Sequence, residues 1–298
     1  MKDNNFSPIA LFVYNRPYHT KKTIEALQKN LLANVSDLFI FSDSYKNETE
    51  IKNVSDVRNY LKLVTEFKNV TIIERQKNLG LANSIISGVT EIANKYGKVI
   101  VLEDDLVTSK YFLTYMNEAL DLYKDVDKVA SIHGYTYPVK YPLPETFFLR
   151  GADCWGWATW KRSWDLFESD GKKLLKLLEK KHLIKEFNLD DSYNYSKMLE
   201  RQILGLNDSW AVRWHASCFL SNKLTLYPGY SLVNNIGHDS SGTHSRKSDS
   251  FETTLYENQI KLQKIPIEEN IIAKKAIIKY FNSKKAGIIS RVIQKLIR

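Results

Sequence analysis

The stretch KVIVLEDDL, residues Lys98 to Leu106, decides how the rest of the sequence is interpreted. Its apolar part is rich in β-branched residues and is typical of a buried central strand in a parallel sheet. Because an unpaired charge inside an apolar core is strongly unfavourable, the three acids that follow must lie where the strand leaves the sheet. In open α/β sheets, ligands bind at this carboxyl edge.

The three acids, Glu103, Asp104 and Asp105, predict a metal site. Side chains alternate along an extended segment, so Glu103 and Asp105 point one way and Asp104 the other. Hard oxygen ligands of this kind suit Mn²⁺ or Mg²⁺, which keep coordination positions open for substrate phosphates. The alternative is that Asp104 and Asp105 cap a helix that begins near Val107. One acid or Ser109 would suffice for a cap, so we favour the metal site.

The sequence around this stretch alternates between strand and helix patterns. Apolar runs of strand length occupy residues 8–14, 38–41, 70–73 and 98–102, and the helical patterns between them occupy residues 18–27, 48–67 and 85–96. Further strands are expected at 129–134 and 224–228, and further helices at 111–123, 171–181, 192–206 and 214–220. This order predicts an α/β fold, a mostly parallel sheet flanked by helices.

Polar side chains recur where these strands end. Asn15 and Arg16 follow the first strand, Asp43 follows the second, and the three acids follow the fourth. The recurrence predicts one site along the carboxyl edge of the sheet. Residues 233–249 form a loop rich in Gly, Ser, Asn, Asp and His that is too long to be idle in a compact domain, and we expect it to cover a ligand.

A cluster of tryptophans is a further candidate feature. Trp155, Trp157, Trp160 and Trp164 lie within one short stretch. Because Trp contributes a large apolar surface, core packing is the favoured interpretation for most of them. The alternative is a flat aromatic platform for the apolar face of a sugar ring.

The chain length and composition limit the class of protein. A chain of 298 residues fits one large domain or two smaller ones. No stretch approaches the about 18 consecutive apolar residues of a membrane span, and the polar start of the chain predicts no secretory signal. Cys154 and Cys218 form neither a metal-binding spacing nor a disulfide framework. We therefore expect a cytoplasmic protein.

We expect a main domain over residues 1–265 and a basic amphipathic helical tail over residues 266–298. Eight Lys and Arg residues and no acid lie between Ile271 and Arg298, so nearly all of the net charge of +9 is in the tail. Asn282, Ser283 and Gly287 predict a break into two short helices. The near-neutral body offers no acidic surface to match the last stretch, so we expect it to bind anionic lipid at the inner face of the plasma membrane.

Taken in order, these motifs resemble a glycosyltransferase of the GT-A fold. The matching positions are Asn15-Arg16-Pro17, Ser42-Asp43, Asn78-Leu79-Gly80, Glu103-Asp104-Asp105-Leu106 and the aromatic Gly-Trp stretch. The order is most similar to the inverting N-acetylglucosaminyltransferases that begin complex N-glycans and to bacterial sugar transferases with the same acidic motif. The resemblance covers roughly residues 7–250. It implies a nucleotide-sugar donor, Mn²⁺ (or Mg²⁺) and a glycan acceptor, which we expect to be lipid-linked and on its way to a bacterial surface.

The resemblance also implies roles for individual residues. Asp105 would ligate the metal directly. Asp43 would hydrogen-bond the nucleotide base, and Arg16 would lie near the base or the diphosphate. The other residues expected around the donor are Asn15, Glu103, Asp104, His238 and His244, of which the two histidines lie in the loop over the donor.

An inverting transfer needs a carboxylate that takes the proton of the acceptor hydroxyl and a cation that stabilises the departing diphosphate. The resemblance implies Asp208 as the base, since it lies two residues before Trp210 at an expected helix start. From the residues alone, a helix N-cap is the simpler role for Asp208. Asp153, beside the tryptophans, is the rival base.

Two other classes of protein compete with this interpretation. A nucleotidyltransferase or phosphotransferase would use the same acids, but Asn15-Arg16-Pro17 is not the Gly-rich basic signature expected after a first strand. A nucleic-acid-binding protein would fit the sequence pI of 9.2. Its excess charge, however, lies in one tail with few aromatic residues and not on a face with stacking side chains, so we expect no nucleic-acid partner.

Overall fold

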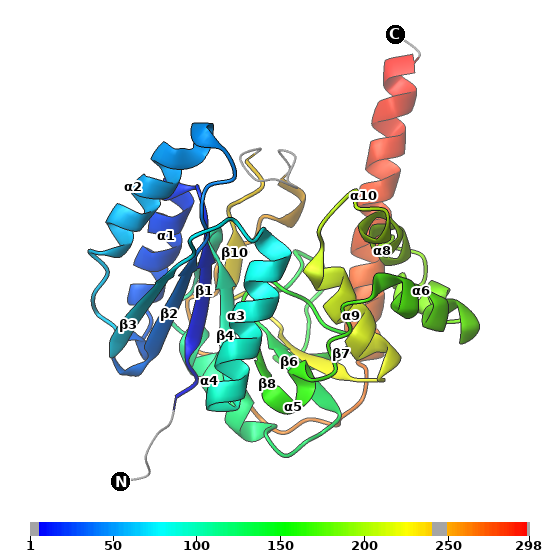
Figure 1. Cartoon of the computed structure of the whole chain (residues 1–298). Helices are drawn as coiled ribbons and strands as arrows, with labels where there is room; N and C mark the ends of the chain where they lie inside the picture. The colour runs from blue at the N-terminus through cyan, green and yellow to red at the C-terminus, as the bar shows by residue number, and fades with distance from the viewer. Residues whose placement is uncertain (1–5, 240–248, 297–298) are drawn as a thin grey trace.

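The computed structural model describes residues 6–239 and 249–296. An eight-stranded sheet forms the centre of the molecule, and helices pack on both of its faces (Figure 1). The strands of this sheet are β1 (Ile9–Val13), β2 (Asp37–Ser42), β3 (Asn69–Glu74), β4 (Lys98–Glu103), β6 (Val129–His133), β7 (Thr146–Arg150), β8 (Trp157–Trp160) and β9 (Leu224–Pro228).

The strands follow the order β3-β2-β1-β4-β8-β6-β9-β7 across the sheet. β3, β2, β1 and β4 are parallel neighbours, and β6 is parallel to β9. β8 is antiparallel to both β4 and β6, and β7 is antiparallel to β9. All strands except β7 and β8 therefore run in one direction, which confirms the predicted α/β fold with a mostly parallel sheet.

The helices connect these strands and cover the sheet. They are α1 (Pro17–Gln28), α2 (Ile51–Leu61), α3 (Leu81–Tyr96), α4 (Phe112–Leu122), α5 (Lys161–Trp164), α6 (Gly171–Lys180), α7 (Ile184–Phe187), α8 (Tyr195–Ile203), α9 (Trp210–Leu220) and α10 (Ile271–Leu296). Short 3₁₀ turns occupy Ala33–Val35, Glu48–Glu50 and Asp249–Phe251. The expected helix over residues 48–67 is shorter in the structure, since it ends at Leu61.

The core occupies both faces of the central strands. Ile9, Leu11 and Val13 of β1 pack with α1, α2 and α4 on one face of the sheet. Ala10 and Phe12 pack with α3 and α9 on the other face. β4 divides its residues between the two faces in the same way. A strand that is buried on both faces has to be apolar throughout, which explains the continuous apolar runs in the sequence.

A small second sheet lies beside the acidic strand end. Residues Leu106–Thr108 form β5, which pairs antiparallel with β10 (Val233–Asn235). The helix that the capping alternative starts near Val107 begins only at Phe112, close to the expected helix over residues 111–123. Asp104 and Asp105 therefore precede a strand, and the alternative that they cap a helix is wrong.

The tryptophans that the sequence groups together are mostly core residues. Trp157 and Trp164 pack with Trp210 and Trp214 in one buried cluster, as the core interpretation predicts. Trp155 differs, because it is only partly buried. β7 and β8 were not predicted. All residues of β8 are buried, so its sequence lacks the alternation that marks a half-exposed strand.

The basic tail is one helix, α10, and the predicted break near residues 282–287 is wrong. Gly and Asn lower helix propensity by only about 1 kcal/mol or less, which does not by itself end a helix. The first half of α10 packs on the sheet domain, where Ala273, Ile277 and Phe281 contact Phe147 and Tyr227. Figure 1 shows the helix leading away from the sheet beyond this contact.

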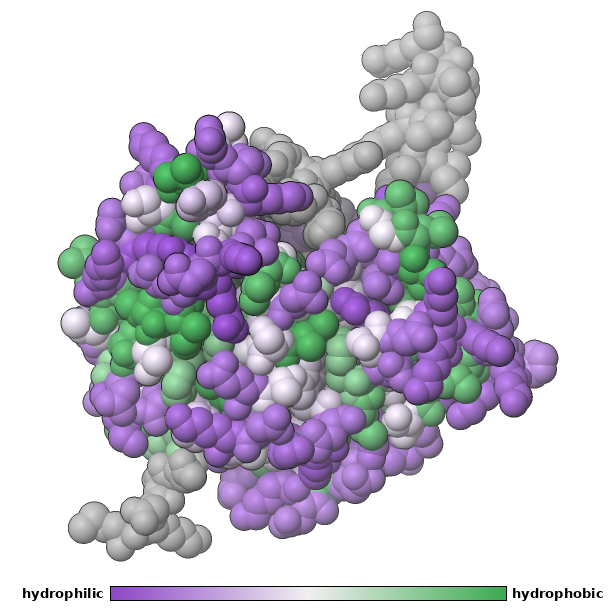
Figure 2. All heavy atoms as spheres, in the orientation of Figure 1, coloured by the Kyte–Doolittle hydropathy of each residue, from purple (hydrophilic) through white to green (hydrophobic). Residues whose placement is uncertain are grey.

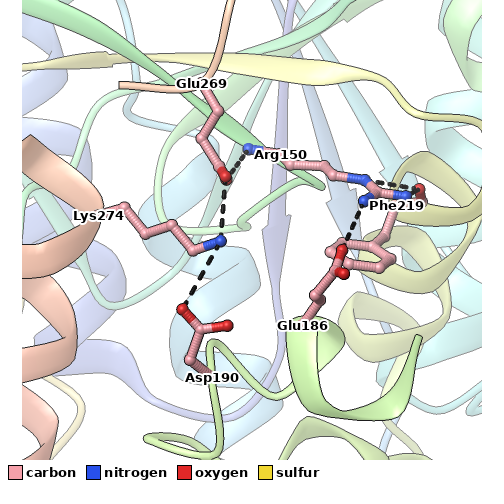
Figure 3. Close-up of polar contacts among 6 residues, drawn as sticks. All are labelled: Arg150, Glu186, Asp190, Phe219, Glu269 and Lys274. Carbon is pink, nitrogen blue, oxygen red and sulfur yellow. Dashed lines mark hydrogen bonds and ion pairs between the residues drawn. The ribbon is translucent and has the colours of Figure 1, made fainter. Parts of the chain in front are cut away.

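Ion pairs hold the start of α10 to the domain (Figure 3). Lys274 Nζ lies 3.0 Å from Glu269 Oε2 and 3.9 Å from Asp190 Oδ2. Glu269 also accepts a hydrogen bond from the backbone N–H of Arg150, whose guanidinium pairs with Glu186. The body thus offers acidic partners to the first part of the basic tail, and the expectation for its last stretch stays a prediction.

The surface of the described residues is predominantly polar on the face in Figure 2, and apolar residues form separate groups between the polar ones. Among residues 6–239 and 249–296, no helix is long and apolar enough to cross a lipid bilayer. α10 reaches 26 residues, but lysines recur along it.

Candidate active site

The carboxyl ends of β1 and β4 meet at one edge of the sheet, because the two strands are parallel neighbours. Arg16 follows β1, and Asp104 and Asp105 follow β4. Nη2 of Arg16 donates to Oδ1 of Asp104 and to Oδ2 of Asp105, the second at 2.9 Å. The structure thus brings together three residues that the sequence marks as site candidates.

The electrostatics of this edge reflect an excess of buried negative charge. Burial raises the pKa of Glu103 to about 8, and repulsion from Asp105 and Asp104 adds to the effect. Burial also raises the pKa of Asp104, although Arg16 opposes the shift. Burial lowers the pKa of Arg16, but attraction to Asp104 and Asp105 outweighs it and the net pKa is raised. An additional positive charge here would stabilise the ionised acids.

A glycine lies directly against the acid pair. Ile236 donates its backbone N–H to the carbonyl of Asp105 at 2.9 Å, which fixes the segment after β10 on the acidic strand end. A Cβ at Gly237 would lie 2.1 Å from Oδ2 of Asp105 and 3.1 Å from Nη1 of Arg16. A side chain at position 237 would therefore require the carboxylate of Asp105 to move and would crowd the guanidinium of Arg16.

His238 follows this glycine and has an unused nitrogen. Nε2 of His238 is buried and has no hydrogen-bond partner among the described residues. The imidazole packs against Trp155 and Phe251, each with a centroid separation of 5.4 Å. Burial lowers the pKa of His238 more than Asp105 raises it, so the neutral ring is favoured and one nitrogen lone pair is available.

These residues fit a divalent metal ion. The guanidinium of Arg16 is a cation between two carboxylates, the cradle at Gly237 is too narrow for a Cβ, and His238 Nε2 has an open lone pair. No three His, Cys, Asp or Glu side chains already surround a common point within the described residues. Mn²⁺ and Mg²⁺ at sites of this kind take one or two carboxylates and complete their shell with water and substrate phosphate.

A pocket of about 250 Å³ lies beside the acid pair. Its lining residues are Asn15, Arg16, Pro17, Tyr18, His19 and Asn53. His19 Nε2 lies 3.1 Å from Oδ2 of Asp239, which joins α1 to the segment after β10. His19 was not among the predicted site residues, although its position three residues after Arg16 at a helix start was a usable signal.

Two other predicted residues have structural partners at this edge. Asn15 donates from Nδ2 to Oε1 of Glu50 at 3.2 Å. The carboxylate of Asp43 accepts hydrogen bonds from the backbone N–H groups of Leu79 and Gly80, at 2.9 and 3.0 Å. Asp43 therefore holds the turn at residues 78–80 in place, and its predicted contact with a nucleotide base stays a prediction.

Asp208 lies at the far side of this turn. A Cβ at Gly80 would be 3.7 Å from Oδ2 of Asp208, and Oδ1 is 3.9 Å from Nη2 of Arg213. The carboxylate is exposed, with 57% of the side chain open to solvent. Ser209 caps α9, since its Oγ accepts the N–H of Val212. The simpler N-cap role considered for Asp208 is therefore wrong.

Asp153 lies in a more enclosed setting, among aromatic rings. Its Oδ2 accepts a hydrogen bond from the hydroxyl of Tyr137 at 2.8 Å, and its Oδ1 accepts the N–H of Cys154 at 2.9 Å. Burial raises the pKa of the Cys154 thiol, and the charges of Asp153, Glu103 and Asp105 raise it further. Asp153 and the acidic strand end thus lie close enough to act on one thiol. His244, the remaining candidate, lies outside the described residues.

Comparisons with known proteins give a likeness of fold. No family model matches the chain, and no curated protein matches it. Among solved structures, the chain is similar to the mannosyltransferase PcManGT from Pyrobaculum calidifontis in complex with GDP-Man and Mn²⁺, at 12% identity and a TM-score of 0.36. It is also similar to S. aureus TarS 1-349 in complex with UDP, at 10% identity and a TM-score of 0.35.

These alignments are partial. The first covers 60% of this chain and 48% of the mannosyltransferase, and the second covers 59% of this chain and 49% of TarS 1-349. The chain therefore spans about half the length of the structures that it matches. Likenesses at this identity and TM-score say nothing about the reaction, so function has to be argued from the side chains.

Proposed function

We propose that this chain is a metal-dependent glycosyltransferase that moves a sugar from a nucleotide-sugar donor to a hydroxyl of a glycan acceptor, with inversion at the anomeric carbon. The acid pair Asp104 and Asp105 at the strand edge carries the proposal, because it is paired with a cation and flanked by Gly237 and His238. Arg16 also lines the adjacent pocket, where it could contact the diphosphate of a nucleotide, and the resemblance of the sequence motifs to GT-A enzymes supports the same chemistry.

In this proposal, Asp105 would ligate Mn²⁺ or Mg²⁺, with Asp104 and His238 beside it, and the ion would supply positive charge to the departing diphosphate. Arg16 would bind diphosphate oxygens through its planar fork of N–H donors. Asp43 would position the turn at residues 78–80, which it holds by accepting the backbone N–H of Gly80.

The base in this proposal is one of two carboxylates. Asp208, the residue that the sequence resemblance implies, is exposed and is not used as a helix cap. Asp153 is oriented by Tyr137 and lies within electrostatic reach of the acidic strand end. We favour Asp153 as the base, because its carboxylate is oriented by Tyr137, whereas that of Asp208 is exposed.

Incubation with a panel of UDP-, GDP- and dTDP-sugars tests the proposal. We expect release of the nucleoside diphosphate with one donor in the presence of Mn²⁺, and loss of release after chelation with EDTA. NMR of the anomeric proton in the product would distinguish inversion from retention. Absence of turnover with every donor and Mn²⁺, or release of pyrophosphate in place of the diphosphate, would favour the rival nucleotidyltransferase or phosphotransferase.

The acceptor and the membrane are part of the same proposal. We infer a lipid-linked glycan acceptor at the inner face of a bacterial membrane, because the last stretch of the tail is basic and apolar at once. The full chain should sediment with anionic liposomes and be released at high salt. A chain that ends at Asn282 keeps the packed first half of α10 and should lose this binding. Equal sedimentation of both chains would contradict the membrane role.

A further inference from the structure

The acid pair at the strand edge already has a cation in the structure. We propose that Arg16 is an exchangeable counter-ion, which occupies the cation position between Asp104 and Asp105 and leaves it when the metal and a nucleoside diphosphate bind together. Arg16 would then make metal binding depend on the nucleotide. This inference rests on the proposed function, since it assumes that the edge binds both ligands.

The position of one nitrogen supports the inference. Nη2 of Arg16 donates to both carboxylates, to Oδ1 of Asp104 and to Oδ2 of Asp105. All three side chains are largely shielded from solvent, at 18%, 6% and 16% exposure. A single positively charged group that contacts the oxygens of two buried acids occupies the place where those acids would hold a metal ion.

Arg16 and a metal ion cannot share the acid pair without repulsion. A metal ion ligated by Oδ2 of Asp105 would lie about 2.1 Å from that oxygen. The guanidinium nitrogen is 2.9 Å from the same oxygen, so the two positive charges would be only a few ångströms apart in a partly buried place. Gly237 leaves little room for both cations, because it lies so close to Asp105 and Arg16 that even a Cβ at this position would contact both side chains.

The adjacent pocket gives Arg16 a second place to go. Arg16 itself lines this pocket, together with neutral side chains and His19. A diphosphate in the pocket would offer oxygens to the guanidinium, and planar Arg pairs with phosphate through two parallel hydrogen bonds. The exchange keeps the charges matched in both states: Arg16 with the acids in the free protein, and the metal with the acids and Arg16 with the phosphates in the complex.

Metal binding by the full chain tests this inference without an activity assay. Mn²⁺ affinity would be measured by EPR of free Mn²⁺ or by calorimetry, with and without saturating UDP or GDP. In the unmodified protein we expect the nucleotide to tighten Mn²⁺ binding by about tenfold or more, within the usual range of coupling between two sites. In Arg16→Gln we expect Mn²⁺ alone to bind about tenfold more tightly and the nucleotide effect to shrink to about threefold or less.

Two further variants make the test specific. Lys21→Gln makes the same charge change at an exposed position of α1, the helix that follows Arg16, and it should reproduce the unmodified protein. Arg16→Lys retains the charge but lacks the planar fork, so it should protect the fold while weakening the nucleotide effect. If Arg16→Gln does not fold, which circular dichroism would reveal, the weaker nucleotide effect expected for Arg16→Lys carries the test.

The outcomes separate the inference from the proposed function. If Arg16→Gln and Arg16→Lys both bind Mn²⁺ and nucleotide with the coupling of the unmodified protein, Arg16 is not an exchangeable counter-ion, although the glycosyltransferase proposal stands. If Arg16→Gln binds Mn²⁺ alone as the unmodified protein does and loses only nucleotide affinity, Arg16 is a simple phosphate ligand. If the unmodified protein binds neither Mn²⁺ nor UDP nor GDP, the proposed function fails together with the inference.

Discussion

Two acidic regions of this molecule balance their negative charge in different ways. Asp104 and Asp105 at the sheet edge are paired with the full positive charge of Arg16. Asp153 is held by neutral donors, the hydroxyl of Tyr137 and the N–H of Cys154. A carboxylate that is paired with one cation can bind another cation in its place. A carboxylate oriented by neutral donors has no paired cation to displace, so the two regions suit the metal and the base of one reaction.

The surroundings of Asp153 reinforce this difference. Burial raises the pKa values of Tyr137, Tyr195 and Tyr227 well above the usual value, and the charge of Asp153 raises them further. These hydroxyls therefore stay protonated and neutral at physiological pH. Phe281 of α10 packs on Tyr137 with a centroid separation of 5.0 Å, so the packed half of the tail also supports this region.

Asp105→Asn should have the largest effect on turnover, because it removes a negative charge from the region in which Arg16 pairs with the acids. We expect turnover to fall by about 10²- to 10³-fold, the usual scale for losing a group that stabilises transition-state charge. Nucleotide-sugar turnover over a Mn²⁺ titration measures the effect, and the thermal midpoint verifies the fold. Turnover and Mn²⁺ dependence like those of the unmodified enzyme would refute the metal role of Asp105.

Asp153→Asn and Asp208→Asn, made side by side, should show which acid accepts the proton. We expect Asp153→Asn to reduce transfer by roughly 10²-fold while donor binding persists, since a general base contributes on that scale. Asp208→Asn should have a much smaller effect, because its carboxylate is exposed. The reverse pattern would assign the base to Asp208 and leave Asp153 as a structural acid.

Gly237→Ala tests the region in which Arg16 pairs with Asp104 and Asp105. The added Cβ would lie 2.1 Å from Asp105 Oδ2, so the acid pair has to shift, at a cost of roughly 1–3 kcal/mol in unfolding free energy. Urea denaturation and Mn²⁺ binding with nucleotide measure both consequences. Gly205→Ala meets no atom within 4 Å, so it should leave Mn²⁺ binding unchanged, although its positive φ of 69° means that it should also lose stability. Unaltered Mn²⁺ affinity in Gly237→Ala would argue against a metal beside Asp105.

Tyr137→Phe should give the smallest effect on transfer, because it removes one of the neutral donors that hold Asp153. The variant removes one hydrogen bond to a carboxylate, which is worth about 1.5 kcal/mol of stability. Tyr123→Phe is the matched control, because Tyr123 donates to the uncharged carbonyl of Gln263. Both variants should lose stability in urea, whereas transfer should decrease only in Tyr137→Phe. Equal transfer by the two variants would mean that Tyr137 does not orient a reacting group.

The sequence by itself determined the sheet and the location of the acids. The apolar runs at β1, β2 and β4 are continuous because each strand is buried on both faces, and this property is local to each segment. Charge cannot remain in such a core, so Glu103, Asp104 and Asp105 had to lie at a strand end. Arg16 was placed at the same edge because parallel neighbouring strands end together.

Only the tertiary structure decided which groups meet at that edge. Arg16 and Asp104 are 88 positions apart, and Gly237 reaches Asp105 only because β10 pairs with β5. The antiparallel strand β8 and the continuity of α10 could not be predicted either, since a fully buried short strand has no alternation and one glycine does not by itself end a helix. Local sequence patterns determine which residues are buried. Contacts between residues far apart in the sequence depend on how the strands and helices pack together, because these side chains meet only in the folded chain.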